Sequence, residues 1–210
     1  LSSAVKAQYS NAYLLTREQI VSTIVSQAKE GDIFVSTTGK LSRELFEFRD
    51  SRKQPHKYDF LTVGSMGHSL MIAYAIAREK KDRRVYCLDG DGAVLMHTGS
   101  MAVVGAGKPE NLVHVVINNE AHETVGGIPT VAGMVNLAAL ALSCAYDKAF
   151  TAATQAELDA VLGSVDQVRG PVFIEVKANL VSRADLGRPT SSPVENKDAF
   201  MEYLSAQKKL

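Results

Sequence analysis

The sequence predicts an α/β protein whose sheet is doubly wound, mostly parallel and covered by helices on both faces. Short apolar runs alternate along the chain with longer amphipathic or alanine-rich segments, as in βαβ proteins. The runs are mainly apolar and do not alternate with polar residues, which is typical of parallel strands that are buried on both faces. The 210 residues, 46% of them hydrophobic, can bury one substantial core, so we expect a single domain.

Strands are predicted where a short apolar run is bounded by turn-forming or charged residues. Gly31 and a Thr37-Thr38-Gly39 turn bound the first run, and charged, proline-containing residues 49–57 precede the second. Glycines end the third run, and the pair Asn118-Asn119 ends the fourth. The expected strands are therefore residues 33–35, 60–63, 84–88, 111–117 and 171–176.

The segments between these strands predict helices. Two of them begin with capping boxes, Thr16-x-x-Gln19 and Thr154-x-x-Glu157. The helices expected elsewhere span residues 41–48, 69–80, 94–105, 135–145 and 197–206. Residues 178–195 are polar and contain proline, so we expect a tail that either folds over a binding site as a lid or covers an edge of the sheet.

Composition narrows the choice of partners and compartment. The formal net charge is zero and no block of like charge occurs, which argues against nucleic acid and anionic membranes and favours a small ligand. Cys87 and Cys144 are expected to be reduced thiols. No apolar run reaches membrane-spanning length and no leader is seen, so we expect a cytoplasmic protein. The first residue is Leu1, which suggests a piece of a longer protein.

A carboxylate and a carboxamide lie one βαβ crossover apart in the central part of the chain. Asp91 follows one expected strand and Asn119 follows the next, so both should emerge at the carboxyl edge of the sheet, where α/β proteins bind ligands. Gly90 and Gly92 let the backbone approach an anion closely. A helix N-terminus attracts an anion by only about 0.3–1 kcal/mol. This attraction is too weak to hold a diphosphate against water, so a site for a diphosphate needs a divalent cation as well. Mg²⁺ suits the oxygen ligands that Asp91 and Asn119 offer.

In this chain Gly90-Asp91-Gly92 is followed by Asn118-Asn119. This pair of motifs resembles the fingerprint of thiamin diphosphate enzymes. Within that superfamily the chain resembles the phosphonopyruvate decarboxylases most, with the sulfopyruvate decarboxylases as near relatives. The segments that carry this resemblance are Ser36-Thr37-Thr38-Gly39-Lys40-Leu41-Ser42-Arg43-Glu44-Leu45, Asn119-Glu120-Ala121-His122-Glu123-Thr124-Val125-Gly126-Gly127 and Ser182-Arg183-Ala184-Asp185-Leu186-Gly187-Arg188-Pro189-Thr190.

The resemblance assigns roles to particular positions. It implies that the Asp91 carboxylate, the Asn119 side chain and the Ala121 backbone carbonyl bind the metal. It also implies that the Gly64 carbonyl accepts a hydrogen bond from the aminopyrimidine and that Met66 wedges beneath the two cofactor rings; an ordinary core methionine is the alternative. The full set of implied cofactor contacts is Thr38, Gly39, Gly64, Ser65, Met66, Gly90, Asp91, Gly92, Ala93, Asn119 and Ala121.

The resemblance also implies an enzymatic activity and a second domain, which this chain does not contain. The activity would be the thiamin diphosphate- and Mg²⁺-dependent decarboxylation of 3-phosphonopyruvate to phosphonoacetaldehyde and CO₂. Residues 1–210 would be the diphosphate-binding domain, with 178–210 as its C-terminal tail and helix. No segment resembles the pyrimidine-binding domain, which carries the activating glutamate in the family. We therefore expect that domain, or an alpha subunit, as a partner in a homo- or hetero-oligomer.

Binding a small anionic 2-keto acid requires cations. Arg183 and Arg188 on the tail are the main candidates, with Lys40 and Arg43 on the first loop, although each could equally be a solvated surface charge. His122 is the candidate for proton transfer to the carbanion that decarboxylation leaves.

Three other functions stay open. One is the sulfopyruvate decarboxylase beta subunit, and another is a different 2-keto acid decarboxylase or carboligase. The third, a non-catalytic nucleotide-binding module, is disfavoured because the chain has neither GxGxxG after its first strand nor GxxxxGK[ST].

Overall fold

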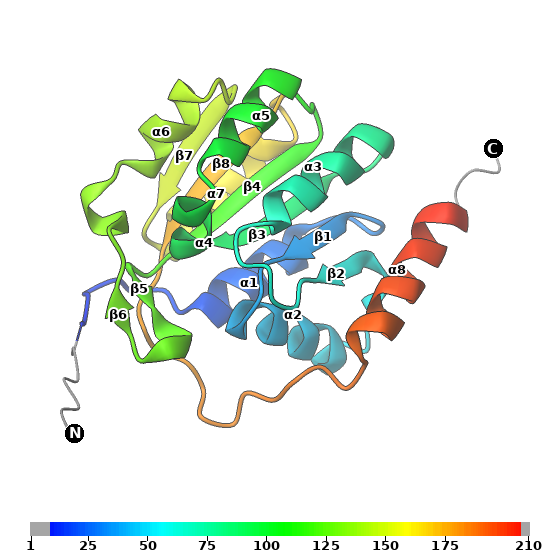
Figure 1. The fold of residues 1–210 in the computed structure, drawn as a ribbon, viewed down its shortest axis with the longest axis horizontal. Coiled ribbons are helices and arrows are strands. Elements are labelled where there is room, and N and C mark those ends of the chain that lie inside the picture. Colours follow the sequence, from blue (N-terminus) through cyan, green and yellow to red (C-terminus); the bar gives the residue numbers. More distant parts are fainter. Residues whose placement is uncertain (1–8, 207–210) are drawn as a thin grey trace.

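A computed structural model describes residues 9–206 of the chain, and its centre is one parallel sheet (Figure 1). The sheet has six strands in the order β2-β1-β3-β4-β8-β7, and every neighbouring pair in it is parallel. The strands are β1 (Ile33–Ser36), β2 (Asp59–Leu61), β3 (Val85–Gly90), β4 (Leu112–Asn118), β7 (Lys148–Ala152) and β8 (Val172–Lys177). The predicted doubly wound, mostly parallel α/β fold is confirmed.

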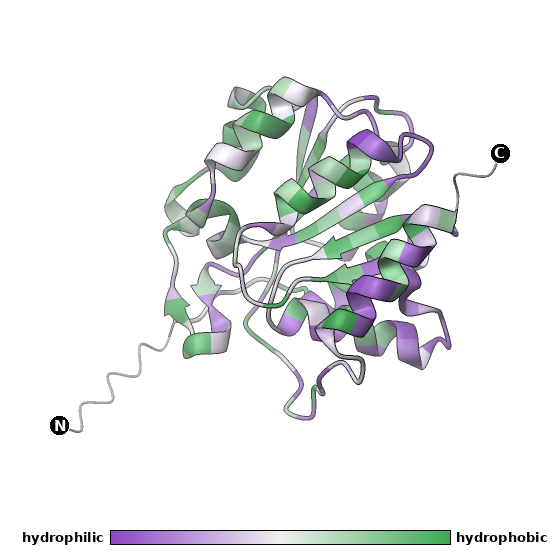
Figure 2. Cartoon of the chain, turned by 45° about the vertical axis from the view of Figure 1, so that its right-hand side comes forward, coloured by the Kyte–Doolittle hydropathy of each residue, from purple (hydrophilic) through white to green (hydrophobic). Residues whose placement is uncertain are grey.

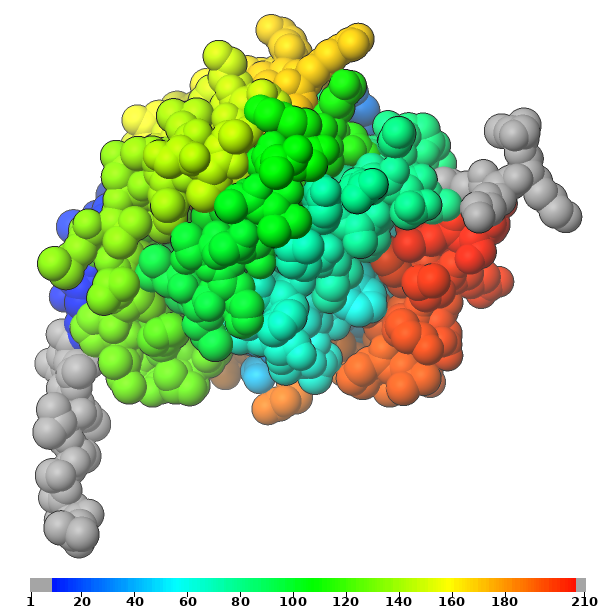
Figure 3. Space-filling model, turned by 45° about the horizontal axis from the view of Figure 1, so that its top comes forward, coloured from blue at the N-terminus to red at the C-terminus, as the bar shows by residue number. Residues whose placement is uncertain are grey.

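Helices cover both faces of this sheet (Figure 1). On one face lie α1 (Arg17–Gln27), α2 (Lys40–Ser51) and α7 (Gln155–Val165). On the other lie α3 (Ser69–Glu79), α4 (Asp91–Met96), α5 (Gly99–Gly107), α6 (Leu137–Ser143) and α8 (Pro193–Ala206). Figure 3 shows α3 and α5 side by side on this second face, with α8 next to α3. Within residues 9–206, no helix has the length and apolar character needed to cross a membrane.

Alternating side chains of the strands build the two halves of the core. On β1, Phe34 contributes to the cluster under α1 and α2, whereas Ile33 and Val35 contribute to the cluster under α3. All four residues of β1 are buried, because helices cover both sides of the strand. In Figure 2 the strands are coloured mainly as hydrophobic, and most hydrophilic residues lie in helices and loops around the sheet.

Several elements differ from those expected. The edge strand β7 has a single buried residue, Ala152, so its sequence lacks the apolar run by which strands are recognised. The helix expected over residues 94–105 is interrupted at His97 and Thr98, so two helices, α4 and α5, stand in its place. Residues expected only as a loop form a small hairpin of β5 (Ala121–His122) and β6 (Ile128–Pro129), with a 3₁₀ turn between them at Glu123–Val125.

The tail covers a sheet edge. The final helix α8 begins at Pro193, before the expected start at 197, because Ser192 and Glu195 form a reciprocal cap and proline suits a first helical position. Asn196 accepts a hydrogen bond from the Leu61 N–H at 3.0 Å and donates one to the Asp59 carbonyl at 2.9 Å. These bonds occupy backbone groups of the edge strand β2, so α8 protects that edge.

Removing one helix cap should have a measurable cost. The Thr154 hydroxyl accepts a hydrogen bond from the Glu157 N–H, and the Glu157 carboxylate accepts one from the Thr154 N–H. We expect Thr154→Ala to lower the free energy of unfolding by about 1 kcal/mol, measured by urea denaturation. Ser26→Ala, which removes an exposed hydroxyl inside α1, is the control and should change it by less than about 0.5 kcal/mol. Equal effects of the two substitutions would contradict a capping role.

Candidate active site

A cavity lies at the carboxyl edge of the sheet, beyond the ends of β1, β3 and β4. It brings together residues from five separate segments of the chain. Most of the residues predicted as cofactor or catalytic contacts line it. They are Thr38, Gly39, Met66, Gly90, Asp91, Gly92, Ala93, Asn119, Ala121 and His122.

Asp91 is the first residue of α4, directly after β3. Its side chain is 3% exposed, and it accepts hydrogen bonds from the Thr130 hydroxyl and from the backbone N–H of Gly92. Burial raises the pKa of this carboxyl above its ordinary value, and the hydrogen bonds oppose that rise. A positive charge within bonding distance would favour the ionised form and offset the burial.

Asn119 follows β4, and the next residues turn sharply into the hairpin. Its side-chain oxygen accepts a hydrogen bond from the Ala121 N–H at 3.2 Å, which fixes the carboxamide against the loop. Glu120, between them, has a left-handed backbone with a φ of 60°. Ala121 stands opposite Pro129 in the hairpin, and the bond beside them runs from the Thr130 N–H to the Glu120 carbonyl at 2.8 Å. In such a non-hydrogen-bonded pair, the Ala121 carbonyl is directed away from the partner strand.

These three groups fit a divalent cation. Each offers oxygen, which Mg²⁺ prefers, and each lines the same cavity. Among the ion pairs formed by residues 9–206, none involves the buried Asp91 carboxylate, so its charge has no lysine or arginine partner there. We therefore treat Asp91, Asn119 and the Ala121 carbonyl as the proposed metal ligands, as the sequence predicts.

Met66, Gly92 and His122 meet at one point of the cavity. A Cβ atom added to Gly92 would lie 2.5 Å from Cε1 of His122 and 3.2 Å from Cε of Met66. Only glycine therefore fits at this position without displacing His122. Met66 is not an ordinary core methionine, because it reaches into the cavity beside the proposed metal ligands. His122 is close enough to act on a ligand held there.

Two neighbouring loops frame the opposite side of the cavity. Thr38 and Gly39 line it, and the Thr38 hydroxyl accepts a hydrogen bond from the Gly64 N–H at 3.2 Å. Gly64 and Ser65 both have left-handed backbones, with φ of 69° and 47°. These two residues are exposed and lie outside the cavity lining, in contrast to Met66, so their predicted cofactor contacts stay predictions.

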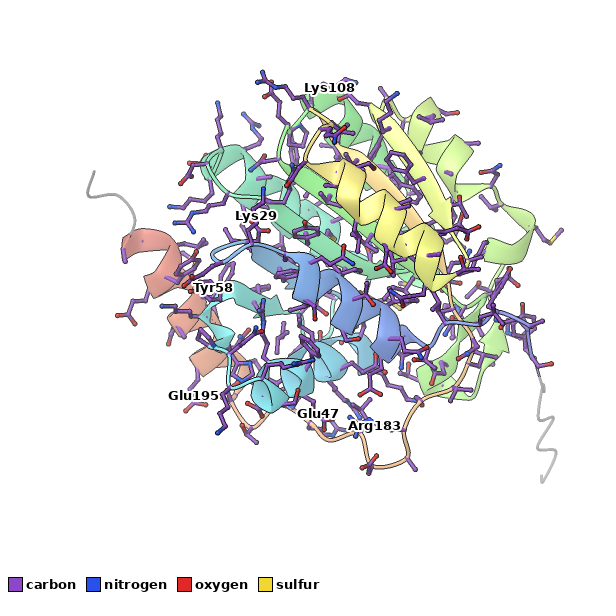
Figure 4. All side chains as sticks on the ribbon, turned by 180° about the vertical axis from the view of Figure 1, so that it is seen from behind. Lys29, Glu47, Tyr58, Lys108, Arg183 and Glu195 are labelled. Atoms are coloured by element: carbon purple, nitrogen blue, oxygen red, sulfur yellow. The ribbon has the colours of Figure 1, made fainter. Side chains whose placement is uncertain are left out.

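The structure does not bring the predicted tail arginines to this cavity. Arg183 lies beside α2, where its guanidinium binds Glu18 at 2.9 Å, Glu47 and Asp185 at 3.3 Å (Figure 4). These partners raise its pKa, chiefly through the hydrogen bond to Glu18. Arg188 is exposed, and neither arginine lines the cavity. The predicted substrate contacts of Arg183 and Arg188 therefore stay predictions, because neither side chain lines this cavity.

A buried ion network forms one wall of the cavity, and sequence reasoning missed its central residue. Arg17, which is 7% exposed, binds Glu44 through Nε at 2.6 Å and Nη2 at 2.7 Å. Its Nη1 binds Glu123, and the Glu123 carboxylate also binds Nζ of Lys40 at 2.6 Å. Desolvation opposes the charge of Glu123, yet Arg17 and Lys40 hold its pKa below the ordinary value. A cation in the first turn of a helix opposes the helix dipole, and that unfavourable placement is the one sequence signal Arg17 offered.

Residues before the first helix hold the loop that carries Asn119. Tyr13 donates a hydrogen bond to the Glu120 carboxylate at 2.6 Å, and Tyr9 donates another to its second oxygen. Burial and the hydrogen bond to Glu120 raise the pKa of Tyr9 to about 12. Asn11 donates to the Asn119 carbonyl at 3.1 Å. The loop is thus tied to a segment more than a hundred residues away in sequence.

Residues 37–176 match the model of a protein family described as thiamine pyrophosphate enzymes, C-terminal TPP binding domain. The chain belongs to this family. The matched stretch includes β1, the Gly90-Asp91-Gly92 turn and the Asn119 loop, so the predicted thiamin diphosphate-binding fold and cofactor are confirmed.

Curated relatives support the same family. The chain is 34% identical over 190 residues to phosphonopyruvate decarboxylase of Streptomyces viridochromogenes, and 90% of this chain and 46% of that protein are covered. It is also 34% identical to sulfopyruvate decarboxylase subunit beta of Methanocaldococcus jannaschii, where 62% of this chain and 67% of that protein are covered. The predicted resemblance to these decarboxylases is confirmed.

A solved structure supports the fold. Benzoylformate decarboxylase from Polynucleobacter necessarius superposes with a TM-score of 0.70 at 15% identity, over 82% of this chain and 34% of that one. The chain therefore spans about half the length of the phosphonopyruvate decarboxylases it matches, and about a third of this structural neighbour.

Proposed function

We propose that this chain is the diphosphate-binding part of a thiamin diphosphate- and Mg²⁺-dependent decarboxylase that converts 3-phosphonopyruvate to phosphonoacetaldehyde and CO₂. The observation that carries the proposal is the meeting of Asp91, Asn119 and Ala121 with Met66 in one cavity. When bound, thiamin diphosphate supplies the electron sink for decarboxylation of a 2-keto acid. In this proposal Asp91, Asn119 and the Ala121 carbonyl would hold the metal, Gly90 and Gly92 would let the diphosphate approach the backbone, and Met66 would contact the cofactor rings.

His122 is placed to serve the last step of such a reaction. It stands beside Gly92 and Met66 in the cavity, and a histidine ring can act as a general acid or base. In this proposal it delivers a proton to the carbon that loses CO₂. We choose phosphonopyruvate as the substrate because the chain is 34% identical to a phosphonopyruvate decarboxylase, in an alignment that covers 90% of this chain.

A partner domain is part of the proposal. Large apolar side chains are exposed in the segments that adjoin the cavity, and such a surface suits burial against another protein. These residues, with the exposed fraction of each, are Val63 (68%), Met96 (58%), Val125 (65%), Ile128 (53%), Val131 (59%) and Met134 (90%). We propose that a pyrimidine-binding domain or alpha subunit covers this edge and that the active species is an oligomer.

A substrate comparison tests the proposed function. The chain, within its full-length protein or reunited with its partner subunit, should turn over phosphonopyruvate with a higher kcat/KM than sulfopyruvate or pyruvate, in the presence of thiamin diphosphate and Mg²⁺. A preference for sulfopyruvate would assign the beta-subunit function that the methanogen relatives carry. A clear preference for pyruvate would rule out the phosphonate assignment.

A further inference from the structure

Two cations in the wall of the cavity converge on a single carboxylate. Arg17 Nη1 and Lys40 Nζ both bind Glu123, and all three residues line the same cavity as Asp91 and Met66. Lys40 Nζ also donates to the Ser182 hydroxyl at 2.7 Å. This arrangement presents several donors to one anionic group, which is how proteins bind tetrahedral oxyanions.

Arg17 cannot turn away from the cavity. Two of its nitrogens are held by Glu44, whose side chain is 2% exposed, in a forked arrangement that fixes the guanidinium plane. The remaining nitrogen, Nη1, is therefore directed at the place that the Glu123 carboxylate occupies. Glu44 thus orients the arginine, and Glu123 is the partner that faces the cavity.

Glu123 sits on a segment that can move without disturbing the core. The 3₁₀ turn Glu123–Val125 contains no buried residue, and Gly126 and Gly127 follow it with left-handed φ of 102° and 72°. Around both glycines, no atom lies within 4 Å of where a Cβ would stand. Displacing the Glu123 carboxylate therefore costs its two ion pairs and the long hydrogen bond from the Asn119 side chain at 3.5 Å, but exposes little apolar surface.

We propose that Arg17 and Lys40 form the subsite for the phosphonate or sulfonate group of the substrate, and that Glu123 occupies this subsite until the substrate displaces it. The inference rests on the proposed function and names the residues that choose its substrate. A phosphonate provides three oxygens to the same donors that Glu123 now uses, whereas pyruvate has no anionic group besides the carboxylate that leaves as CO₂. The cations would therefore select for 2-keto acids with a second anionic group.

The test uses the complete enzyme with thiamin diphosphate and Mg²⁺ at saturation. Lys40→Met should raise KM for phosphonopyruvate about 10- to 100-fold, as expected for the loss of a charge-assisted bond, and should raise KM for pyruvate much less, so that the preference for phosphonopyruvate falls. Lys29→Met is the control, because Lys29 is a surface lysine that pairs with Asp166 at 2.5 Å. It should leave both substrates unaffected.

Binding of methylphosphonate, followed by broadening of its phosphorus NMR line, gives a readout that needs no turnover. Lys40→Met should abolish the broadening, whereas Glu123→Gln should strengthen binding severalfold because the internal competitor loses its charge. Weaker methylphosphonate binding in Glu123→Gln would overturn the proposal, since Glu123 would then support the site rather than occupy it.

The same variants separate the substrate from the cofactor as the source of the anion. If Lys40→Met weakens calorimetric binding of thiamin diphosphate and leaves the preference for phosphonopyruvate over pyruvate intact, the cations hold the cofactor diphosphate and the subsite proposal is wrong. A wild-type enzyme that prefers pyruvate while still binding methylphosphonate in a Lys40-dependent manner would instead overturn the proposed function and leave the subsite standing.

Discussion

Asp91→Ala is expected to abolish Mg²⁺-dependent binding of thiamin diphosphate, measured calorimetrically on the chain within its full-length protein or with its partner. Asp91 is the one carboxylate among the three proposed metal ligands, and it lies buried, with no lysine or arginine of the described residues paired to it. Loss of a group that only orients a metal ligand already costs about 10–100-fold in affinity. Loss of the ligand itself should exceed about 100-fold, and added EDTA should reduce wild-type binding similarly.

A second variant separates the charge from the loop structure. Asp91→Asn keeps the size of the side chain and an oxygen that can accept from Thr130, so the loop should persist while metal binding falls. Asp166→Asn removes an exposed carboxylate and serves as the control. Cofactor affinity that stays unchanged in Asp91→Ala, with Mg²⁺ present, would eliminate Asp91 as a metal ligand.

Arg49→Met is expected to lower the free energy of unfolding by about 3–5 kcal/mol, because it leaves a charge buried without a partner. Arg49 on α2 binds Asp59 on β2 through Nε and Nη2, both at 2.9 Å, and the side chain of Asp59 is 1% exposed. The guanidinium also lies 5.1 Å from the ring centre of Phe34. Chemical denaturation monitored by circular dichroism measures the effect.

A surface pair and a double variant provide the controls. Lys29→Met breaks an exposed pair with Asp166 and should cost at most about 1 kcal/mol. Arg49→Met combined with Asp59→Asn should lose less stability than the sum of the two single variants, because neither charge is then left alone. Strict additivity of the two substitutions would show that the pair itself contributes nothing.

The elements that the sequence predicted share a strong local signal. The strands β1, β3, β4 and β8 are mainly apolar and almost entirely buried, and α1 and α7 carry capping boxes whose hydrogen bonds the structure contains. The edge strand β7 has no such run, because it is covered less and mixes polar with apolar residues. Its place in the sheet comes from pairing with β8, which is a tertiary interaction.

Some residues of the candidate site could be predicted from the sequence, and others could not. Asp91 and Asn119 were predictable together, because each directly follows a strand and β3 pairs with β4 in parallel register. Thr130, whose hydroxyl binds Asp91, was not predictable, because the hairpin that returns it to α4 shows no regular pattern. Arg183 was predicted as a substrate contact from its charge alone, and the structure gives that charge to Glu18 and Glu47.

By itself, the sequence determined the βαβ order, the paired polar ends of β3 and β4 and the membership of the chain in the thiamine pyrophosphate enzymes. Those features depend on residues that are close together along the chain, and the hydrophobic periodicity and turn-forming residues of such segments can be recognised from the sequence. Only the tertiary structure decided which cations face the cavity. Charged side chains are long, and their partners often come from distant parts of the chain. Arg183 therefore forms a surface ion pair, whereas Arg17 lines the cavity.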